Sequence, residues 1–166
     1  PVTAAAVILP KDFKNYMLND SKVLSLKKRK TLRDIIIKNA LDYSISHVSA
    51  KIIDKINILN ASILAMNLAI DKLKINPEFI IVDGNRFESK KEIPYRCIIK
   101  GDSKYMSIAA ASILAKTSRD KYMIKLSNSY PEYNWAQNKG YPTKMHKKAI
   151  LKNDITIHHR KTFKLN

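Results

Sequence analysis

The stretch that decides the fold reads Phe79-Ile80-Ile81-Val82-Asp83-Gly84, an apolar run that stops at a carboxylate and a glycine. A short apolar run bounded by a turn pair predicts a strand buried on both faces, as in the centre of an α/β sheet. A second run, Cys97-Ile98-Ile99, stops in the same way at Lys100-Gly101-Asp102. Because open α/β sheets gather catalytic groups at strand ends, we expect Asp83 and Asp102 to lie together.

Two carboxylates at neighbouring strand ends form a site suited to hard divalent cations. The chain also carries 31 Lys and Arg against 14 Asp and Glu, a net charge of +17. A carboxylate–metal site in a basic protein indicates chemistry on a phosphate backbone. Simpler interpretations stay open, because Asp83-Gly84 is also a common turn pair and Asp102 also suits a helix cap. The lysine-rich composition also fits codon drift in an AT-rich genome, so charge alone is weak support.

The segments on either side of these runs alternate between strand and helix patterns. Ser25 and Ser49 each precede a run with helical periodicity and are suited to cap it. Strands are predicted over 2–9, 41–48, 79–82 and 93–99, and helices over 26–40, 49–73, 105–126 and 144–151. This order predicts one α/β domain over residues 1–166.

The composition also restricts where the protein works. We find no run of about 18 apolar residues and no signal peptide, so we expect no membrane partner. Cys97 is the single cysteine, which excludes an internal disulfide and favours the cytoplasm.

Several polar residues outside the strand ends are candidates for a role. Tyr141 follows Gly140 on a predicted turn, where an exposed ring could stack on a base or sugar, although many such tyrosines cover a core edge. Asp120 is expected to be a surface salt-bridge partner within a helix. The histidines lack zinc spacing, so we expect surface or phosphate-facing positions for His146, His158 and His159.

Seven segments, taken together, form a specific pattern. They are Leu18-Asn19-Asp20-Ser21-Lys22, Ile53-Asp54-Lys55-Ile56-Asn57-Ile58-Leu59, Val82-Asp83-Gly84-Asn85-Arg86, Lys100-Gly101-Asp102-Ser103-Lys104, Ala109-Ala110-Ala111-Ser112-Ile113-Leu114-Ala115-Lys116 with Arg119-Asp120, Lys139-Gly140-Tyr141-Pro142-Thr143 and His158-His159-Arg160-Lys161-Thr162-Phe163. Their order and spacing resemble bacterial ribonuclease HII over nearly the whole chain.

The resemblance implies a ribonuclease H-like mixed sheet flanked by helices, with a C-terminal helical region. It implies cleavage of RNA in RNA–DNA hybrids and at ribonucleotides embedded in duplex DNA, leaving a 3′-hydroxyl and a 5′-phosphate. It implies Mg²⁺ or Mn²⁺ held by four carboxylates, two of which match Asp83 and Asp102. We expect the protein to act as a monomer.

The resemblance also implies which residues contact the substrate. Tyr141 matches a tyrosine that stacks on the sugar next to the ribonucleotide, and a segment that contacts the backbone matches Asn19, Ser21 and Lys22. From their residue types, further backbone contacts are expected from Arg86, Lys104 and His146.

One departure from the family pattern is large. The family's first strand ends in D-E-x-G-R-G, and Pro1-Val2 resembles the residues just after that motif. We therefore expect the domain to be incomplete at its N-terminus, lacking the first strand, two carboxylates and the loop that reads the ribose 2′-hydroxyl. A chain of this extent is expected to be catalytically impaired. The alternatives are a silent fragment that binds hybrid or duplex nucleic acid without cleavage and, more weakly, a general basic DNA-binding protein.

Overall fold

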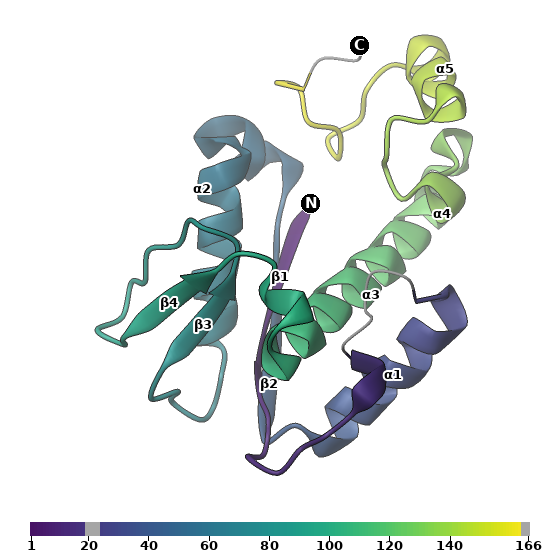
Figure 1. Cartoon of the computed structure of the whole chain (residues 1–166). Helices are drawn as coiled ribbons and strands as arrows, with labels where there is room; N and C mark the ends of the chain where they lie inside the picture. Colours follow the sequence, from purple (N-terminus) through teal and green to yellow (C-terminus); the bar gives the residue numbers. More distant parts are fainter. Residues whose placement is uncertain (19–23, 164–166) are drawn as a thin grey trace.

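Strands and helices alternate up to residue 83, a further strand follows without a helix between, and helices make up most of the remaining chain (Figure 1). The computed structural model describes residues 1–18 and 24–163. The elements are β1 (Val2–Ile8), α1 (Leu26–Asn39), β2 (Asp42–Val48), α2 (Ala50–Asp71), β3 (Ile80–Asp83), β4 (Tyr95–Ile98), the 3₁₀ turn η2 (Gly101–Ser103), α3 (Met106–Ser129), the 3₁₀ turn η3 (Pro131–Tyr133), α4 (Trp135–Asn138) and α5 (Lys144–Asn153). The predicted element order is confirmed, with α4 and the 3₁₀ turns in addition.

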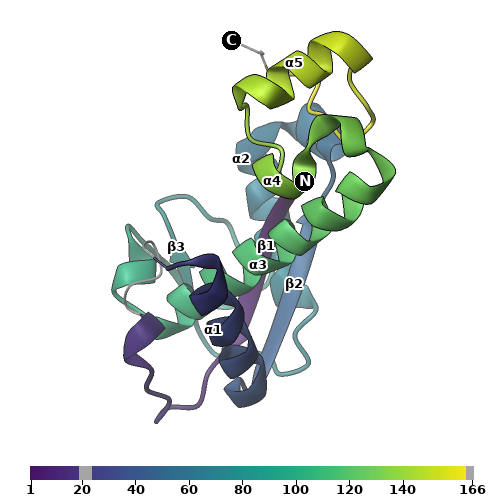
Figure 2. The same ribbon diagram turned by 90° about the vertical axis from the view of Figure 1, so that its right-hand side faces the viewer.

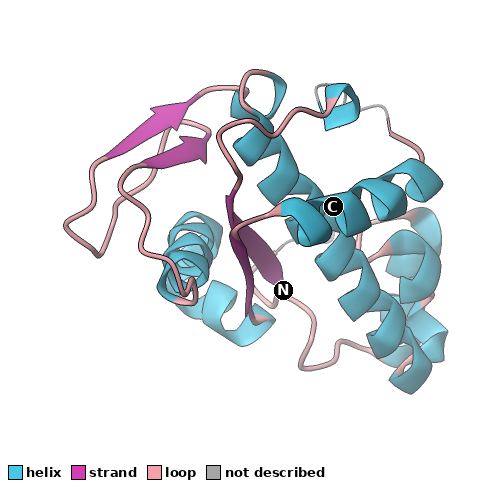
Figure 3. Cartoon of the chain, turned by 90° about the horizontal axis from the view of Figure 1, so that it is seen from below, coloured by secondary structure: helices cyan, strands magenta, loops and turns pink. Residues whose placement is uncertain are grey.

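The long strands β1 and β2 form an antiparallel ribbon in the middle of the molecule. Val2 pairs with Val48 at one end, and Ile8 pairs with Asp42 at the other. Helices α2 and α3 lie on opposite sides of this ribbon (Figure 3). The small side chains of Ala109 and Ala110 are fully buried, which lets α3 approach the neighbouring elements closely.

The strands that carry the two apolar runs, β3 and β4, form a separate parallel pair. Ile80 pairs with Tyr95, and Asp83 pairs with Ile98. The predicted mixed sheet is therefore found in part: the described residues contain both an antiparallel and a parallel pair, but as two sheets of two strands each. In the described parts of the chain, no strand lies between the two pairs to join them by hydrogen bonds. They meet through side chains instead, since Ala6 of β1 packs on the apolar cluster around Ile80 and Val82.

The predicted serine caps are confirmed, and they explain where the first two helices begin. The Ser25 hydroxyl accepts from the Lys28 N–H, and the Ser49 hydroxyl accepts from the Ile52 N–H. Helix α2 is interrupted at Asn57, whose φ of 63° lies in the left-handed region. Its side-chain oxygen accepts from the Asn60 N–H at 3.0 Å and restarts the helix.

Helix α2 is relevant to the expectation that the protein has no membrane-spanning segment. Its 22 residues are long enough to cross a membrane, and an 18-residue window within it has a mean hydropathy of 1.2. In this fold it packs against β1 and β2, with Ile53, Ala61 and Ala65 fully buried. Its Asn67 side chain accepts from the Lys90 N–H and donates to the Glu88 carbonyl. One face of α2 therefore packs against the rest of the described fold.

The C-terminal helices gather at the far end of α3 (Figure 2). Their core consists of Met123, Tyr133, Trp135 and Ile150, which are all buried. Tyr133 and Trp135 stack with ring centroids 5.0 Å apart. Truncating a buried aromatic side chain of this kind costs about 3–5 kcal/mol, so this cluster anchors the region that follows α3.

Candidate active site

The two aspartates of the sequence pattern lie at facing ends of neighbouring elements. Asp83 is the last residue of β3, and Asp102 is the middle residue of η2. The Gly101 N–H donates to Asp83 Oδ1 at 2.8 Å, which brings the Asp83 carboxylate to the residue directly before Asp102. Asp83 is exposed, whereas Asp102 is only 7% exposed. The arrangement places one accessible and one buried carboxylate at the same end of the β3–β4 pair.

The turn at Gly101 lies close to both α3 and Asp83. A Cβ at Gly101 would lie 2.6 Å from Cδ1 of Ile108 and 3.5 Å from Oδ1 of Asp83. The Gly101 carbonyl accepts from the N–H groups of Lys104 and Tyr105 at 3.0 and 2.9 Å, which tightens the turn. Glycine therefore lets the backbone of η2 approach Asp83 and the first turn of α3 together.

The structure tests the two simpler interpretations of these aspartates, a turn at Asp83 and a helix cap at Asp102. Asp83-Gly84 does form a turn, with Gly84 at φ 101° and its N–H bonded to the Ile98 carbonyl at 3.0 Å. Asp102 does not cap α3, because the N-cap of that helix is Tyr105 and it makes no side-chain cap bond. The turn predicted at Asp83 is therefore confirmed, and Asp102 is not the N-cap residue of α3.

The donor chemistry suits a hard divalent cation, because both side chains offer carboxylate oxygens. In the described ranges 1–18 and 24–163, however, no group of three or more His, Cys, Asp or Glu side chains could hold a metal ion. Asp83 and Asp102 therefore fit part of a metal site, with the remaining ligands to come from water, substrate or other carboxylates.

Of the residues predicted to contact the nucleic-acid backbone, the structure describes some and not others. Arg86 and Lys104 are exposed and follow Asp83 and Asp102 by three and two residues, so both can reach a polyanion at this site. Asn19, Ser21 and Lys22 lie outside the described residues.

Tyr141 is exposed, as a ring that stacks on a base or sugar must be. The ring lies against α3. The Tyr141 side chain is 53% exposed, on a turn in which Lys139 and Gly140 have φ values of 51° and 78°. Lys116 Nζ and Arg119 Cζ lie 5.6 and 5.3 Å from the ring centroid. Such distances allow cation–π attraction, which holds the ring beside two cations.

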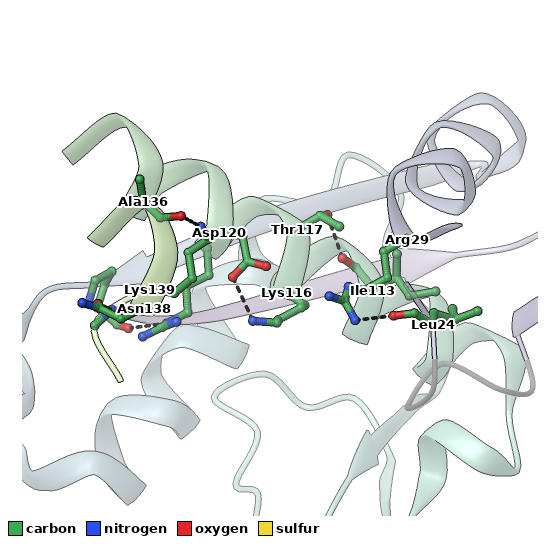
Figure 4. A network of polar contacts seen from close by, with 12 residues as sticks. Leu24, Arg29, Ile113, Lys116, Thr117, Asp120, Ala136, Asn138 and Lys139 are labelled. Carbon is green, nitrogen blue, oxygen red and sulfur yellow. Dashed lines mark hydrogen bonds and ion pairs between the residues drawn. The ribbon is translucent and has the colours of Figure 1, made fainter. Parts of the chain in front are cut away.

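Lys116, one of the two cations beside Tyr141, is held by an ion pair, and Lys139 on the same turn is bonded to the backbone. Lys116 Nζ donates to Asp120 Oδ1 at 2.8 Å, and the Lys139 ammonium caps the Ala136 carbonyl (Figure 4). The prediction that Asp120 is a salt-bridge partner is confirmed, but its surface position is wrong, because the residue is only 7% exposed. The difference arises because Asp120 lies on a buried face of α3, where its carboxylate is paired with Lys116. Sequence reasoning missed Lys116 and Arg119, whose three-residue spacing places both on one helix face.

The surface position expected for His146 is wrong. Its side chain is 5% exposed, and both ring nitrogens are hydrogen-bonded inside the protein. Trp135 and Tyr133, packed around it, exclude solvent, so a direct contact to a nucleic-acid backbone is not supported. His158 and His159 are half-buried in the same cluster, where burial lowers the pKa of both rings.

A hollow of about 360 Å³ lies beside Tyr141, and both Arg119 and Arg160 line it. Burial and the nearby Arg119 guanidinium lower the pKa of Arg160, as expected for two cations held close together. The chain at Arg160 is tied to α2, because the Asp54 carboxylate accepts from the Lys161 and Thr162 N–H groups at 2.9 and 3.0 Å. Two arginines beside an exposed aromatic ring form a surface suited to a phosphate–sugar chain.

Known structures share this arrangement of elements. The crystal structure of the ribonuclease H2 from Pyrococcus horikoshii OT3 matches with a TM-score of 0.76 and 27% sequence identity, over 89% of this chain and 77% of that chain. The ribonuclease HII in a complex with PCNA from Archaeoglobus fulgidus matches in fold with a TM-score of 0.72 and 23% identity, over 90% and 80% of the two chains. The fold is therefore that of an α/β protein of the ribonuclease H2 type.

Sequence comparison makes the assignment more specific. The profile of the family described as Ribonuclease HII matches residues 1–166. The ribonucleases HII of Christiangramia forsetii and Parabacteroides distasonis are 62% and 58% identical, over 99% of this chain and 83% and 82% of their own lengths. The chain belongs to the ribonuclease HII family.

Proposed function

We propose that the protein is an endoribonuclease that cleaves RNA in RNA–DNA hybrids and nicks duplex DNA at embedded ribonucleotides. The observation that carries the proposal is the Asp83 carboxylate held by the Gly101 N–H next to Asp102. This pair supplies oxygen ligands at the end of a strand pair in a family of ribonucleases. The exposed carboxylate of Asp83 is accessible to substrate, and the buried carboxylate of Asp102 forms the inner side of the site.

Mg²⁺ or Mn²⁺ is the cofactor that this donor set favours, with Asp83 and Asp102 among its ligands. When bound, such ions supply an activated water and neutralise charge on the leaving oxygen. The residues of this chain prepare the site. The Gly101 N–H orients one Asp83 oxygen and leaves the other free, and the exposed cations of Arg86 and Lys104 attract the phosphate backbone.

Substrate binding is proposed to continue along α3. Lys116 and Arg119 lie about 15–20 Å along the helix axis from its first residue, Met106, at a rise of about 1.5 Å per residue. Tyr141 lies over these two cations, with the hollow lined by Arg119 and Arg160 next to it. A phosphate–sugar chain that passes from Asp83 to Tyr141 would therefore meet cations at both ends. The ring of Tyr141 would stack on a sugar.

The test is cleavage by two conservative variants of the full-length protein, Asp83→Asn and Asp102→Asn. Each keeps the side-chain volume and removes the negative charge that a divalent cation requires. We expect cleavage of a duplex with one embedded ribonucleotide to fall at least about 100-fold, or roughly 2.7 kcal/mol of activation free energy. Arg96→Gln, an exposed change on β4, is the matched control. Activity of either aspartate variant within a few-fold of the unchanged protein would defeat the proposal.

A second function applies to a polypeptide made of residues 1–166 alone. Since its described residues contain no group of three potential ligands, we propose that it holds metal loosely and binds hybrid or duplex nucleic acid with impaired cleavage. A nicking assay beside a gel-shift assay tests this. Binding with strongly reduced nicking is expected, and near-normal metal-dependent nicking would contradict it. A monomer in the reducing cytoplasm is also proposed, and the unpaired Cys97 supports that compartment.

A further inference from the structure

A chain of hydrogen bonds connects the buried aromatic cluster to the exposed Tyr141. The Trp135 indole Nε1–H donates to Nε2 of His146 at 3.0 Å. An indole N–H can only donate, so this nitrogen of His146 is an acceptor, and the neutral ring carries its proton on Nδ1. His146 Nδ1 lies 3.0 Å from the Tyr141 carbonyl oxygen. The buried imidazole therefore donates to the backbone of Tyr141.

The hydrogen bonds of His159 lead to the same conclusion, that Nε2 of His146 is an acceptor. The Thr156 N–H donates to His159 Nδ1 at 2.9 Å, so that nitrogen is an acceptor and the proton sits on Nε2. His159 Nε2 lies 3.2 Å from His146 Nε2, whose single lone pair is thus shared between the Trp135 and His159 N–H donors. Burial, with His146 and His158 nearby, lowers the pKa of His159 to about 4, consistent with a neutral ring.

The hydrogen bond from His146 Nδ1 to the Tyr141 carbonyl contacts the backbone segment that carries the exposed Tyr141 ring. The Tyr141 carbonyl also accepts from the Thr143 N–H at 2.8 Å, and the Tyr141 N–H donates to the Asn138 carbonyl at 2.8 Å. The Thr143 bond spans only two residues, whereas the His146 bond ties the turn to the helical core. Without it, the backbone under the exposed ring keeps local bonds only.

We propose that His146 is a positioning residue, which holds Tyr141 for contact with the substrate by donating its Nδ1 proton to the Tyr141 carbonyl. The inference rests on the proposed function in one respect, that Tyr141 faces the substrate. The simpler alternative is a histidine that only fills the core. The alternatives differ in which ring nitrogen matters, because the contact with Trp135 stabilises the core and the contact with Tyr141 sets the turn.

Two amide variants, each of which keeps a polar group near the place of one ring nitrogen, separate the two nitrogens. In His146→Asn the amide nitrogen takes about the place of Nδ1 and can donate to the Tyr141 carbonyl, but the side chain is too short to accept from Trp135. In His146→Gln the amide oxygen reaches toward Trp135, but no donor is left near Tyr141. Both variants lose packing, so their melting temperatures serve as the measure of the core role.

The first experiment measures position without using activity. In the full-length protein with ¹³C-labelled tyrosine, Tyr141→Phe identifies the NMR signal of Tyr141. We expect this signal to shift or broaden in His146→Gln and to stay near its original place in His146→Asn. An unchanged signal in His146→Gln, or the same change in both variants, would overturn the inference.

The second experiment measures single-turnover cleavage of a duplex with one embedded ribonucleotide. We expect about a 10-fold loss in His146→Gln, a loss under about 3-fold in His146→Asn, and little further loss when His146→Gln is added to Tyr141→Ala. Equal losses in both variants that follow their melting temperatures would overturn the inference. If the unchanged protein cleaves no ribonucleotide-containing duplex, the proposed function fails, and the NMR result still decides whether His146 positions Tyr141. If the protein cleaves but Tyr141→Ala costs nothing, the substrate role of Tyr141 and this inference fall together.

Discussion

Adding one methyl group at Gly101 tests whether the contact between η2 and β3 builds the active site. In Gly101→Ala the new Cβ would lie 2.6 Å from Cδ1 of Ile108, closer than carbon atoms approach, and 3.5 Å from Oδ1 of Asp83. Ile108 is 5% exposed, so its side chain has little room to turn away. Either Ile108 leaves its rotamer or η2 moves away from β3, and the second response lengthens the bond between the Gly101 N–H and Asp83.

The magnitude follows from the packing. Overfilling a buried contact costs roughly 1–3 kcal/mol, and the lower entropy of the unfolded chain on Gly→Ala offsets about 0.4–1 kcal/mol. We expect a net loss of about 1 kcal/mol in the free energy of unfolding. Cleavage should fall further, by about 10- to 100-fold, because a shift of about 1 Å in a catalytic group costs up to roughly 100-fold.

The assay combines urea unfolding with metal-dependent nicking of a duplex that contains one ribonucleotide. Ile108→Val removes Cδ1 alone, and with it the 2.6 Å contact, so it is the matched compensating change. The double variant should recover most of the nicking lost in Gly101→Ala, while Ile108→Val alone costs about 0.5–1.5 kcal/mol of stability with little effect on nicking. Full activity in Gly101→Ala, or a double variant no more active than Gly101→Ala, would refute the reasoning.

Three further predictions concern the far end of α3. Tyr141→Ala should reduce cleavage by about 10- to 100-fold, since stacking is worth about 1–3 kcal/mol; the melting temperature should hardly change, and Tyr141→Phe should stay active. The pKa of His159 is lowered from 6.5 to about 4 by burial and by the nearby His146 and His158. The unfolded chain therefore binds this proton at a higher pH than the folded protein, so the free energy of unfolding should fall as the pH drops from 6.5 toward 4, and His159→Gln should show a shallower slope in chemical unfolding. Asp54→Asn weakens the bonds from the Lys161 and Thr162 N–H groups, at a cost of about 1 kcal/mol after allowance for solvent exposure. Faster proteolysis after Arg160 is expected, and an unchanged rate would show that Asp54 does not hold this segment.

The sequence predicts best where the signal is short in range. Ser25 and Ser49 mark helix starts because a cap bonds to a backbone N–H only three residues away. Asp83 and Asp102 are recognised as candidates because the apolar runs before them stop abruptly. Tyr141 is exposed on the turn where the glycine before it predicts one.

The departures from the predictions have a common physical origin, which is contact between residues distant in the chain. His146 is buried because Trp135 and His159, 11 and 13 residues away, bond to the same ring nitrogen. The strands separate into two pairs because pairing depends on which edges meet, and the alternation of side chains along each strand carries no information about that.

The sequence by itself therefore determined the order of the elements, the family and the residue types at the candidate site. Only the tertiary structure decided that the Gly101 N–H, 18 residues from Asp83, holds that carboxylate beside Asp102. Only the tertiary structure placed Lys116 and Arg119 against Tyr141 and a buried histidine behind its carbonyl. The reason is that capping, turns and periodicity act over a few residues, whereas burial and hydrogen-bond partners are set once the whole chain packs.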